Sequence, residues 1–226
     1  MTDDDPFGSE TPNPEPETKR DGRVARRDAT QARLLNATIE LLASNGYEGS
    51  SIDQVAELAG VSKGSVFYNF GSKAELFGAS IAHSANMMRE QLAQVRGRAR
   101  SWEAMHLITL AFVQLVNENS STSLVASTEL FRRGRPWEAE MAGARQIFAE
   151  PFARAFMEIA QDRRASEPEP SDSPDDEYAS AEVIAMYLLG LMVFGVLDRV
   201  RFSSHRRIEQ VHGQIMTAAR GLATML

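Results

Sequence analysis

The chain has 226 residues, of which 43% are hydrophobic, so it can bury the core of one medium domain or of two small ones. It contains no cysteine, which excludes disulfides, thiolate metal sites and cysteine nucleophiles. Its net charge of −7 is unevenly distributed: residues 1–18 carry six acids and no base, and residues 162–177 carry a net charge of −5, which leaves +4 on the remainder. The negative total therefore does not exclude a nucleic-acid partner, because salt screens charges that lie more than a Debye length apart.

The first segment, residues 1–18, is acidic and rich in proline. Such a composition buries too little apolar surface to become ordered, so we expect a disordered tail. The segment lacks the basic start and the apolar run of a signal peptide. The longest apolar stretch, residues 183–197, is shorter than the roughly 20 residues of a membrane span, so we expect a soluble cytoplasmic protein with no membrane partner.

A basic arm follows the tail, with six lysines and arginines between residues 19 and 33. The arm is either a floppy basic tail or a segment that contacts DNA phosphates or the minor groove, through Arg23, Arg26 and Arg27. After it, leucines at helical spacing predict a first helix over residues 29–44. Asp28 is placed to cap this helix, with Gln31 at capping-box spacing.

Two short helices are predicted next, over residues 52–59 and 63–69, joined by a tight turn that contains Gly60. Ser51 with Gln54 caps the first, and Ser62 caps the second. Small and branched residues form the apolar face of the first helix, and we expect Val66, Phe67 and Phe70 to form that of the second. This is the geometry of a helix-turn-helix. The outer face of the second helix then carries side chains that can hydrogen-bond base edges and phosphates, namely Lys63, Ser65, Tyr68 and Asn69.

Longer helices are predicted for the rest of the chain. Ser72 with Glu75 caps a fourth helix that runs to about residue 96, and Ser101 caps a fifth over residues 102–117. Further helices are expected over residues 122–132, 136–161, 178–200 and 204–225. Pro136 suits the first turn of its helix, whereas Pro151 should kink or split that helix near Phe148. Residues 165–176 combine prolines, acids and serines and predict a mobile loop. No segment reads as a convincing strand, so the predicted fold class is all-α.

Taken in order, the N-terminal part contains Gly46-Tyr47, Ser51-Ile52, Val55-Ala56, Ala59-Gly60-Val61-Ser62, Gly64-Ser65, Phe67-Tyr68, Phe70, Ser72-Lys73 and Leu76. This succession, within about residues 29–77, resembles the DNA-binding head of the TetR family of repressors. The resemblance implies a three-helix head that, with the basic arm, occupies residues 19–75. A fourth helix would join it to a helical effector-binding and dimerisation domain over residues 76–226.

The resemblance also implies roles for individual residues. The second helix of the motif would enter the major groove, with contacts from Lys63, the backbone of Gly64, Ser65, Tyr68 and Asn69. Lys73 would hold a phosphate at the start of the fourth helix, and Ser51 and Gln54 would hold the DNA backbone. Asn69 stands where the family more often has His or Tyr, which leaves the operator sequence open. Ala74 replaces a common acid.

The stretch 183–197 is apolar on nearly every side, so its helix must be buried on more than one face. The resemblance implies that the last two helices pair with their mates in the four-helix interface of a two-fold homodimer. The two heads would then read half-sites of a roughly palindromic operator in double-stranded DNA. The interface candidates are Gly190, Phe194, Leu197, Ile208, Val211, Ile215 and Leu222.

The middle helices are rich in aromatic residues and methionine, which fits either an ordinary core or an apolar cavity for a small aromatic or lipophilic effector. The candidates for effector contact are His106, Phe112, Asn117, Phe131, Met141, Arg145, Phe148 and Met186. The four histidines show no metal-binding spacing, and neither a phosphate-binding glycine loop nor a Ser-His-Asp order stands out. We therefore expect no metal, no cofactor and no enzymatic activity.

The resulting prediction is a dimeric repressor that a small-molecule effector releases from its operator. Three alternatives stay open. The chain is a DNA-binding nucleoid or scaffold protein without ligand control, or an enzyme or carrier that reuses the fold, or an activator. A repressor and an activator share these features, because the sign of regulation depends on where the operator lies relative to the promoter.

Overall fold

The computed structural model describes residues 17–129, 132–166, 174–201 and 206–226. Within these ranges every regular element is a helix, which confirms the all-α prediction. The elements are α1 (Glu17–Asn45), α2 (Ile52–Ala59), α3 (Lys63–Phe70), α4 (Lys73–Arg96), α5 (Ser101–Glu118), α6 (Ser120–Glu129), α7 (Glu138–Ser166), α8 (Pro174–Arg201) and α9 (Ile208–Ala223). Among these helices, none combines the length and the apolar character needed to cross a bilayer.

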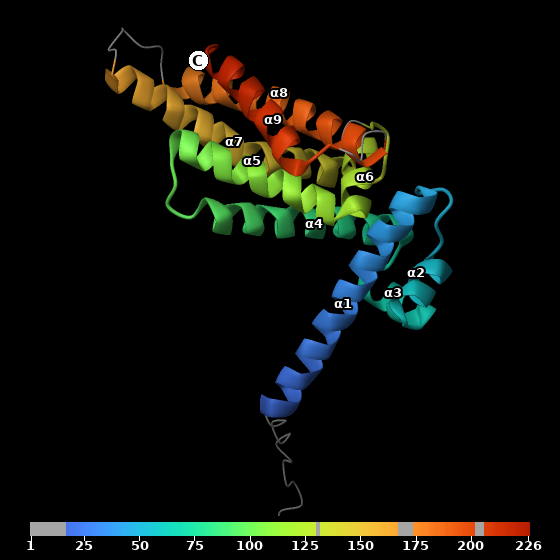
Figure 1. The fold of residues 1–226 in the computed structure, drawn as a ribbon. Coiled ribbons are helices and arrows are strands. Elements are labelled where there is room, and N and C mark those ends of the chain that lie inside the picture. The colour runs from blue at the N-terminus through green and yellow to red at the C-terminus, as the bar shows by residue number, and fades with distance from the viewer. Residues whose placement is uncertain (1–16, 130–131, 167–173, 202–205) are drawn as a thin grey trace, which may run out of the picture.

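The helices form a small head and a larger body (Figure 1). In the head, α2 packs against the C-terminal half of α1 and against α3. The body is layered around α7, which packs against α4, α5 and α8, while α9 covers α5 and α8. Both α4 and α6 also pack against α1, so they join the head to the body. One hydrophobic core runs through both parts, from Leu34 and Val55 in the head to Phe156 and Leu188 in the body.

The most visible difference from the sequence prediction is the start of α1. The predicted helix begins at residue 29, but α1 begins at Glu17, so the predicted basic arm is helical and the last two residues of the predicted tail belong to the helix. Asp28 therefore lies inside the helix and does not cap it. The N-terminal half of α1 projects beyond the head (Figure 1). The remainder of the predicted tail, residues 1–16, lies outside the described residues.

Helix starts in the head agree with prediction, whereas two features of the body do not. Ser51, Ser62 and Ser72 cap α2, α3 and α4 as expected. The predicted cap of α5 is wrong, because Ser101 is its first helical residue and its hydroxyl donates a hydrogen bond to Asp162 of α7 instead. The predicted split at Pro151 is also wrong, since α7 runs through this residue without interruption. Packing on three sides stabilises α7 across the proline.

The predicted loop over residues 165–176 is shorter than expected at both ends, because α7 continues to Ser166 and α8 begins at Pro174. Residues 167–173 lie outside the described residues. The start of the last predicted helix also differs, since α9 begins at Ile208. The helix α7 begins at Glu138, two residues later than expected, because Pro136 lies in a turn before it.

Candidate nucleic-acid interface

The α2–α3 turn holds the two helices of the motif at a fixed angle. Gly60 adopts a left-handed conformation with φ of 65°, which residues with a Cβ rarely adopt, and its N–H donates to the last carbonyls of α2. Two residues later, the Ser62 hydroxyl accepts a hydrogen bond from the Ser65 N–H and starts α3. Behind the turn, side chains from both helices are buried in the core, namely Ile52, Val55, Ala56, Ala59, Val66 and Phe70. The helix-turn-helix is therefore fixed by local bonds and by its own apolar faces.

The outer face of α3 is available to a large partner. Tyr68, in the last turn of α3, is 82% exposed, and Lys63 and Gly64 at the start of the helix are exposed as well. Lys63 forms an exposed ion pair of 2.9 Å with Asp53 of α2, which solvent and a competing phosphate can readily replace. Two other predicted contact residues are only partly exposed. The Ser65 hydroxyl lies 3.0 Å from that of Ser62, and the Asn69 side-chain amide donates to the Ser65 carbonyl at 2.7 Å.

The prediction for Phe67 is wrong. It was expected in the core with Val66 and Phe70, but its side chain is 46% exposed. Val66 and Phe70 are four residues apart and therefore share one face, whereas Phe67 is turned away from it by about one quarter of a turn. Helical spacing within the motif was thus the signal that places Phe67 beside Tyr68 on the outer face of α3.

Ser51 and Gln54 lie at the exposed start of α2. They form a complete capping box, in which the Ser51 hydroxyl accepts from the Gln54 N–H at 3.2 Å and the Gln54 side-chain oxygen accepts from the Ser51 N–H at 2.8 Å. These bonds hold both exposed side chains in place at the start of α2.

Lys73 has a second role that the sequence did not reveal. Its Nζ donates to the Tyr47 carbonyl at 2.6 Å and lies 4.0 Å from the centre of the Tyr47 ring. This contact ties the start of α4 to the turn after α1. An ammonium group has three donors, so a phosphate contact remains compatible with this bond.

The arginines of the predicted arm lie on the projecting part of α1. Arg26 and Arg27 are exposed, and Arg23 belongs to the helix, although its side chain lies outside the described part of the chain. Arg33, which was not predicted as a contact, reaches the α2–α3 turn: a Cβ built on Gly60 would lie 3.9 Å from its Nη1 atom.

The predicted effector residues are divided between the core and the surface. Phe112, Met141 and Phe148 are buried, and the last two line an apolar cavity of about 20 Å³ between α1, α4, α6 and α7. Met186 and Arg145 are partly buried. His106 and Asn117 lie on the surface instead, where His106 packs edge-on against His212 and Asn117 accepts from the Arg199 guanidinium. Phe131 lies outside the described residues.

The predicted dimer residues are divided in the same way. Gly190 is partly buried and Phe194 is 74% exposed, on an outer face of α8 that also presents Val183, Tyr187 and Leu191. Val211 and Ile215 are buried within the single chain, where α9 packs on α5 and α8, so they do not form an outward face. Ile208 and Leu222 are partly buried against the same core. The side chain of Leu197 lies outside the described part of the structure.

A junction between head and body surrounds Tyr47. Its ring packs edge-on against Phe77 of α4 and Trp137 before α7, with ring centres 5.1 and 4.5 Å apart. Arg135 crosses the junction, because its guanidinium pairs with Glu48 of the head at 3.1 Å and lies 3.6 Å from the buried Glu129 of α6. Sequence spacing gave no sign of this cluster, since its members are up to 90 residues apart.

Comparisons with known proteins agree with this geometry. Residues 34–79 match the family model of bacterial regulatory proteins, tetR family. Over 82 residues the chain is 31% identical to the HTH-type transcriptional regulator SrpR of Pseudomonas putida, which covers 36% of this chain and 38% of the relative. It is 38% identical over 68 residues to the DNA-binding transcriptional repressor TetR of Mycobacteroides abscessus, covering 30% of this chain and 36% of the relative. The chain thus matches less than two fifths of the length of these relatives.

The likeness in fold extends further than the likeness in sequence. The crystal structure of the transcriptional regulator FadR from Bacillus subtilis, solved with stearoyl-CoA, superposes with a TM-score of 0.68 at 14% identity and covers 83% of this chain and 96% of that chain. The fold of the body is therefore shared although its sequence has diverged. Residues 34–79 therefore match the DNA-binding head of the tetR family of bacterial regulatory proteins, and the chain shares the all-helical fold of a solved transcriptional regulator.

Proposed function

We propose that the chain is a transcriptional repressor that inserts α3 into the major groove of double-stranded DNA. The observation that carries this proposal is the outer face of α3. It exposes the large aromatic side chain of Tyr68 in the last turn of α3, and it exposes Lys63 and Gly64 at the capped N-terminal end. A Tyr hydroxyl and a Lys ammonium are donors to phosphate, and the helix N-terminus adds a partial positive charge.

The proposed repressor acts as a homodimer through α8. Val183, Tyr187, Leu191 and Phe194 are spaced three or four residues apart and are each at least half exposed, so they form one apolar stripe. A contiguous exposed apolar stripe is typical of a protein–protein interface. A two-fold axis at this stripe would present two α3 helices to the half-sites of a roughly palindromic operator.

The proposed effector is small and lipophilic or aromatic. It would enter the body at the apolar cavity lined by Ile39 of α1, Ile81 of α4 and Phe148 of α7. A volume of about 20 Å³ holds about one water molecule, so an effector must push these helices apart. The lining includes a head helix, and such a displacement would reach the head directly. The Bacillus subtilis FadR structure holds a fatty acyl-CoA, which supports the lipophilic class.

Release requires that the effector bind the DNA-incompetent arrangement more tightly than the DNA-bound one. The junction around Tyr47 is suited to transmit the change, because Arg135 contacts both Glu48 in the head and Glu129 in α6. A shift of α6 relative to α1 would break or remake this pair. The proposal therefore links the cavity to the angle at which α3 is presented.

The test of DNA binding begins with selection of duplexes from a random-sequence library by the full-length protein. We expect an enriched, roughly palindromic motif. Tyr68→Ala should weaken binding to the enriched duplex about tenfold, since it removes one phosphate contact and its packing. Met87→Ala serves as the control, because Met87 is an exposed apolar residue (47%) on α4, away from the residues proposed to contact DNA. Failure to enrich any sequence would contradict the proposal.

The dimer and the effector are tested separately. Leu191→Glu and Phe194→Glu should each shift the protein from dimer to monomer in analytical ultracentrifugation, because a carboxylate would be buried unpaired at the stripe. Fatty acids, acyl-CoAs, phenols and drug-like aromatics are then screened by thermal shift. A ligand of the native state should raise the melting temperature with the logarithm of its concentration and dissociate the enriched duplex. A ligand that binds free and DNA-bound protein equally would contradict release.

A further inference from the structure

The N-terminal half of α1 is a helix without a structural role in the head. Residues 25–29 are all exposed, and the first fully buried residue of the helix is Leu34. Residues 17–33 therefore form a rod about 25 Å long that projects past the helix-turn-helix, at 1.5 Å per residue (Figure 1). A segment this long that contributes nothing to the core is placed to contact something outside the chain.

Charges along this rod are separated onto two sides. Positions 19, 23, 26, 30 and 33 are three or four residues apart and share one side of the helix, and all but position 30, a threonine, are lysine or arginine. The three acids, at positions 17, 21 and 28, are four and seven residues apart and therefore share one side of the helix as well. This is the opposite side, because each acid lies two residues, or about 200°, from one of the bases at positions 19, 23 and 26. The rod therefore has a basic side and an acidic side.

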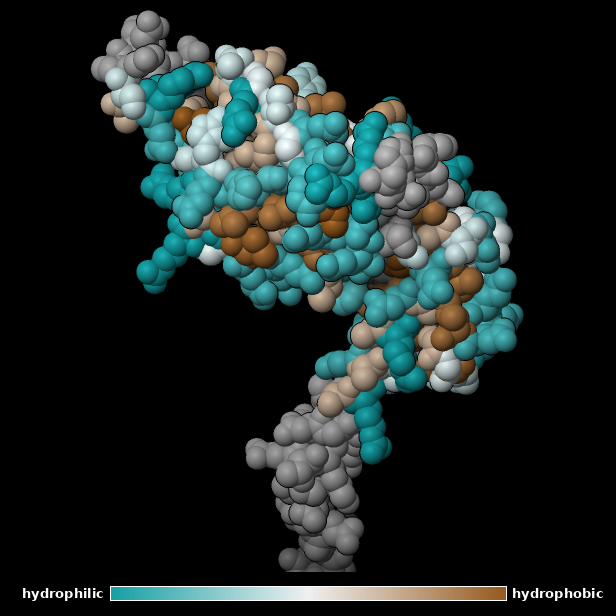
Figure 2. Space-filling view, viewed as in Figure 1, coloured by the Kyte–Doolittle hydropathy of each residue, from teal (hydrophilic) through white to brown (hydrophobic). Residues whose placement is uncertain are grey.

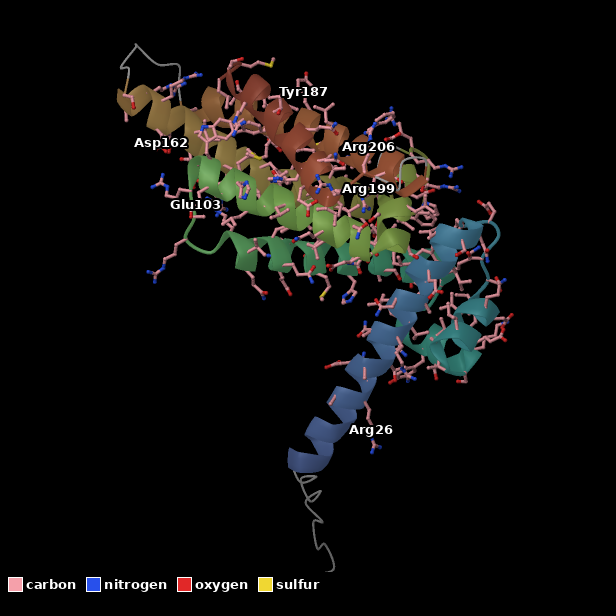
Figure 3. The ribbon with its side chains drawn as sticks, in the orientation of Figure 1. Arg26, Glu103, Asp162, Tyr187, Arg199 and Arg206 are labelled. Atoms are coloured by element: carbon pink, nitrogen blue, oxygen red, sulfur yellow. The ribbon has the colours of Figure 1, made fainter. Side chains whose placement is uncertain are left out.

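The basic side faces the same way as the helix-turn-helix. At the base of the rod, the Arg33 guanidinium approaches the Gly60 turn between α2 and α3. One turn further out, Thr30 donates to the Arg26 carbonyl, and Figure 3 shows the Arg26 side chain on the side of α1 where α2 and α3 lie. Arg27, next to it, is exposed as well.

The amino-acid composition of the rod favours a polyanion as its binding partner and not a membrane surface. Its apolar residues are one valine and three alanines, so it lacks the broad face of large apolar side chains that an interfacial membrane helix buries. Figure 2 agrees, since the described part of the rod shows only hydrophilic and weakly hydrophobic residues on this face. Duplex DNA is a polyanion with one negative charge per 1.7 Å of axis, so a helix of this length can lie beside several phosphates.

We propose that residues 17–33 of α1 are a second, helical DNA-binding element, which lies along the phosphate backbone flanking the half-site that α3 reads. This inference rests on the proposed function. Its chemistry is ion pairing of arginines with phosphates, so it adds affinity and footprint length without adding sequence preference. The helical state matters, because it keeps the basic side turned toward the duplex and the acidic side away from it.

The test uses the full-length protein, an enriched duplex and a random-sequence duplex of the same length, across 50–300 mM NaCl. Arg26→Ala/Arg27→Ala should weaken binding to both duplexes by about tenfold or more near 100 mM salt. It should also lower the slope of log affinity against log salt by about 1 to 2, since each phosphate contact contributes about 0.9. Arg98→Ala/Arg154→Ala is the matched control, because it removes the same charge from exposed positions on the body.

A second variant, Ala29→Pro, keeps every charge but interrupts the helix before its packed part. It should bind as weakly as the double arginine variant and protect a shorter stretch of DNA from hydroxyl radicals. If Ala29→Pro binds like wild type, the segment acts as a flexible tail and the helical element is wrong. If wild type enriches a motif but the double arginine variant keeps its affinity and salt slope, DNA contact by this segment is overturned while α3 recognition stands. Arginine-dependent binding to phosphatidylserine vesicles, with DNA affinity unchanged, would also overturn it.

Discussion

The head and the body of this protein fix their helix ends in different ways. In the head, the hydroxyls of Ser51, Ser62 and Ser72 each accept a hydrogen bond of 3.2 Å from an N–H three residues later. In the body, two helix ends are also held by partners on neighbouring helices. The Ser101 N–H at the start of α5 donates to Glu158 of α7 at 2.9 Å, and Arg199 of α8 donates to the Arg206 carbonyl before α9 at 2.9 Å. Local bonds are visible in a sequence motif, whereas distant ones are not.

The largest effect is expected at Trp137, where the two regions meet. Its side chain is fully buried between head and body, and its indole N–H has no hydrogen-bond partner in the described part of the chain. Trp137→Ala should lower the free energy of unfolding by about 4 kcal/mol, since it leaves a cavity in a shared core. Trp137→Phe should cost less than about 1.5 kcal/mol, because no hydrogen bond is lost. Urea unfolding followed by circular dichroism measures both, and equal losses would contradict this account.

The next largest effect tests the long-range anchoring of the body. Glu158 accepts hydrogen bonds from the Arg96 guanidinium and the Ser101 N–H, and both members of the ion pair are nearly buried. Glu158→Gln should lower the free energy of unfolding by about 3 kcal/mol, because it leaves the Arg96 charge buried without a counterion. The control is Glu150→Gln, which removes an exposed i,i+4 pair with Arg154 and should cost at most about 0.5 kcal/mol. Similar losses of unfolding free energy in the two variants would show that the buried Glu158–Arg96 pair stabilises the fold no more than an exposed pair does.

A smaller effect tests the local caps of the head. Ser62→Ala removes the acceptor for the Ser65 N–H and should lower the free energy of unfolding by about 1 kcal/mol. The same loss should weaken DNA binding, because the start of α3 frays. Ser62→Asp keeps the acceptor and should preserve most of the stability, as chemical denaturation can check. No loss in Ser62→Ala would mean that α3 is held by Val66 and Phe70 alone.

The smallest effect concerns pH. Burial and the neighbouring His106 lower the pKa of His212, and these outweigh the opposing hydrogen bond to the His106 carbonyl. Between this lowered value and the usual value of about 6.5, the unfolded chain binds more protons than the folded chain, so stability should rise with pH across that window. His212→Gln should flatten the rise. Melting temperatures measured from pH 5 to pH 8 test this, and an identical slope in the variant would contradict it.

These differences explain which parts could be predicted from the sequence. The helix-turn-helix, its turn at Gly60 and its three serine caps follow from residues within four positions of one another. The aromatic junction, the Arg135 pairs and the surface positions of His106 and Asn117 depend on how long helices pack, and apolar spacing alone does not set that packing. Phe67 was misplaced because Val66 and Phe70 beside it are buried, although the helical period separates it from them. The helical state of the arm was missed because its charges are typical of a solvated tail.

The two tryptophans lie at opposite ends of the body, so their fluorescence can report on the two places separately. Trp137 is fully buried beside Tyr47, whereas Trp102 is 38% exposed at the start of α5, far from the head (Figure 1). Indole emission moves to longer wavelength as water reaches the ring. In a Trp102→Phe background, all tryptophan emission comes from the contact between head and body. Fluorescence would then report the movement of the head during effector binding without any added dye, and its rate could be followed in a stopped-flow cell.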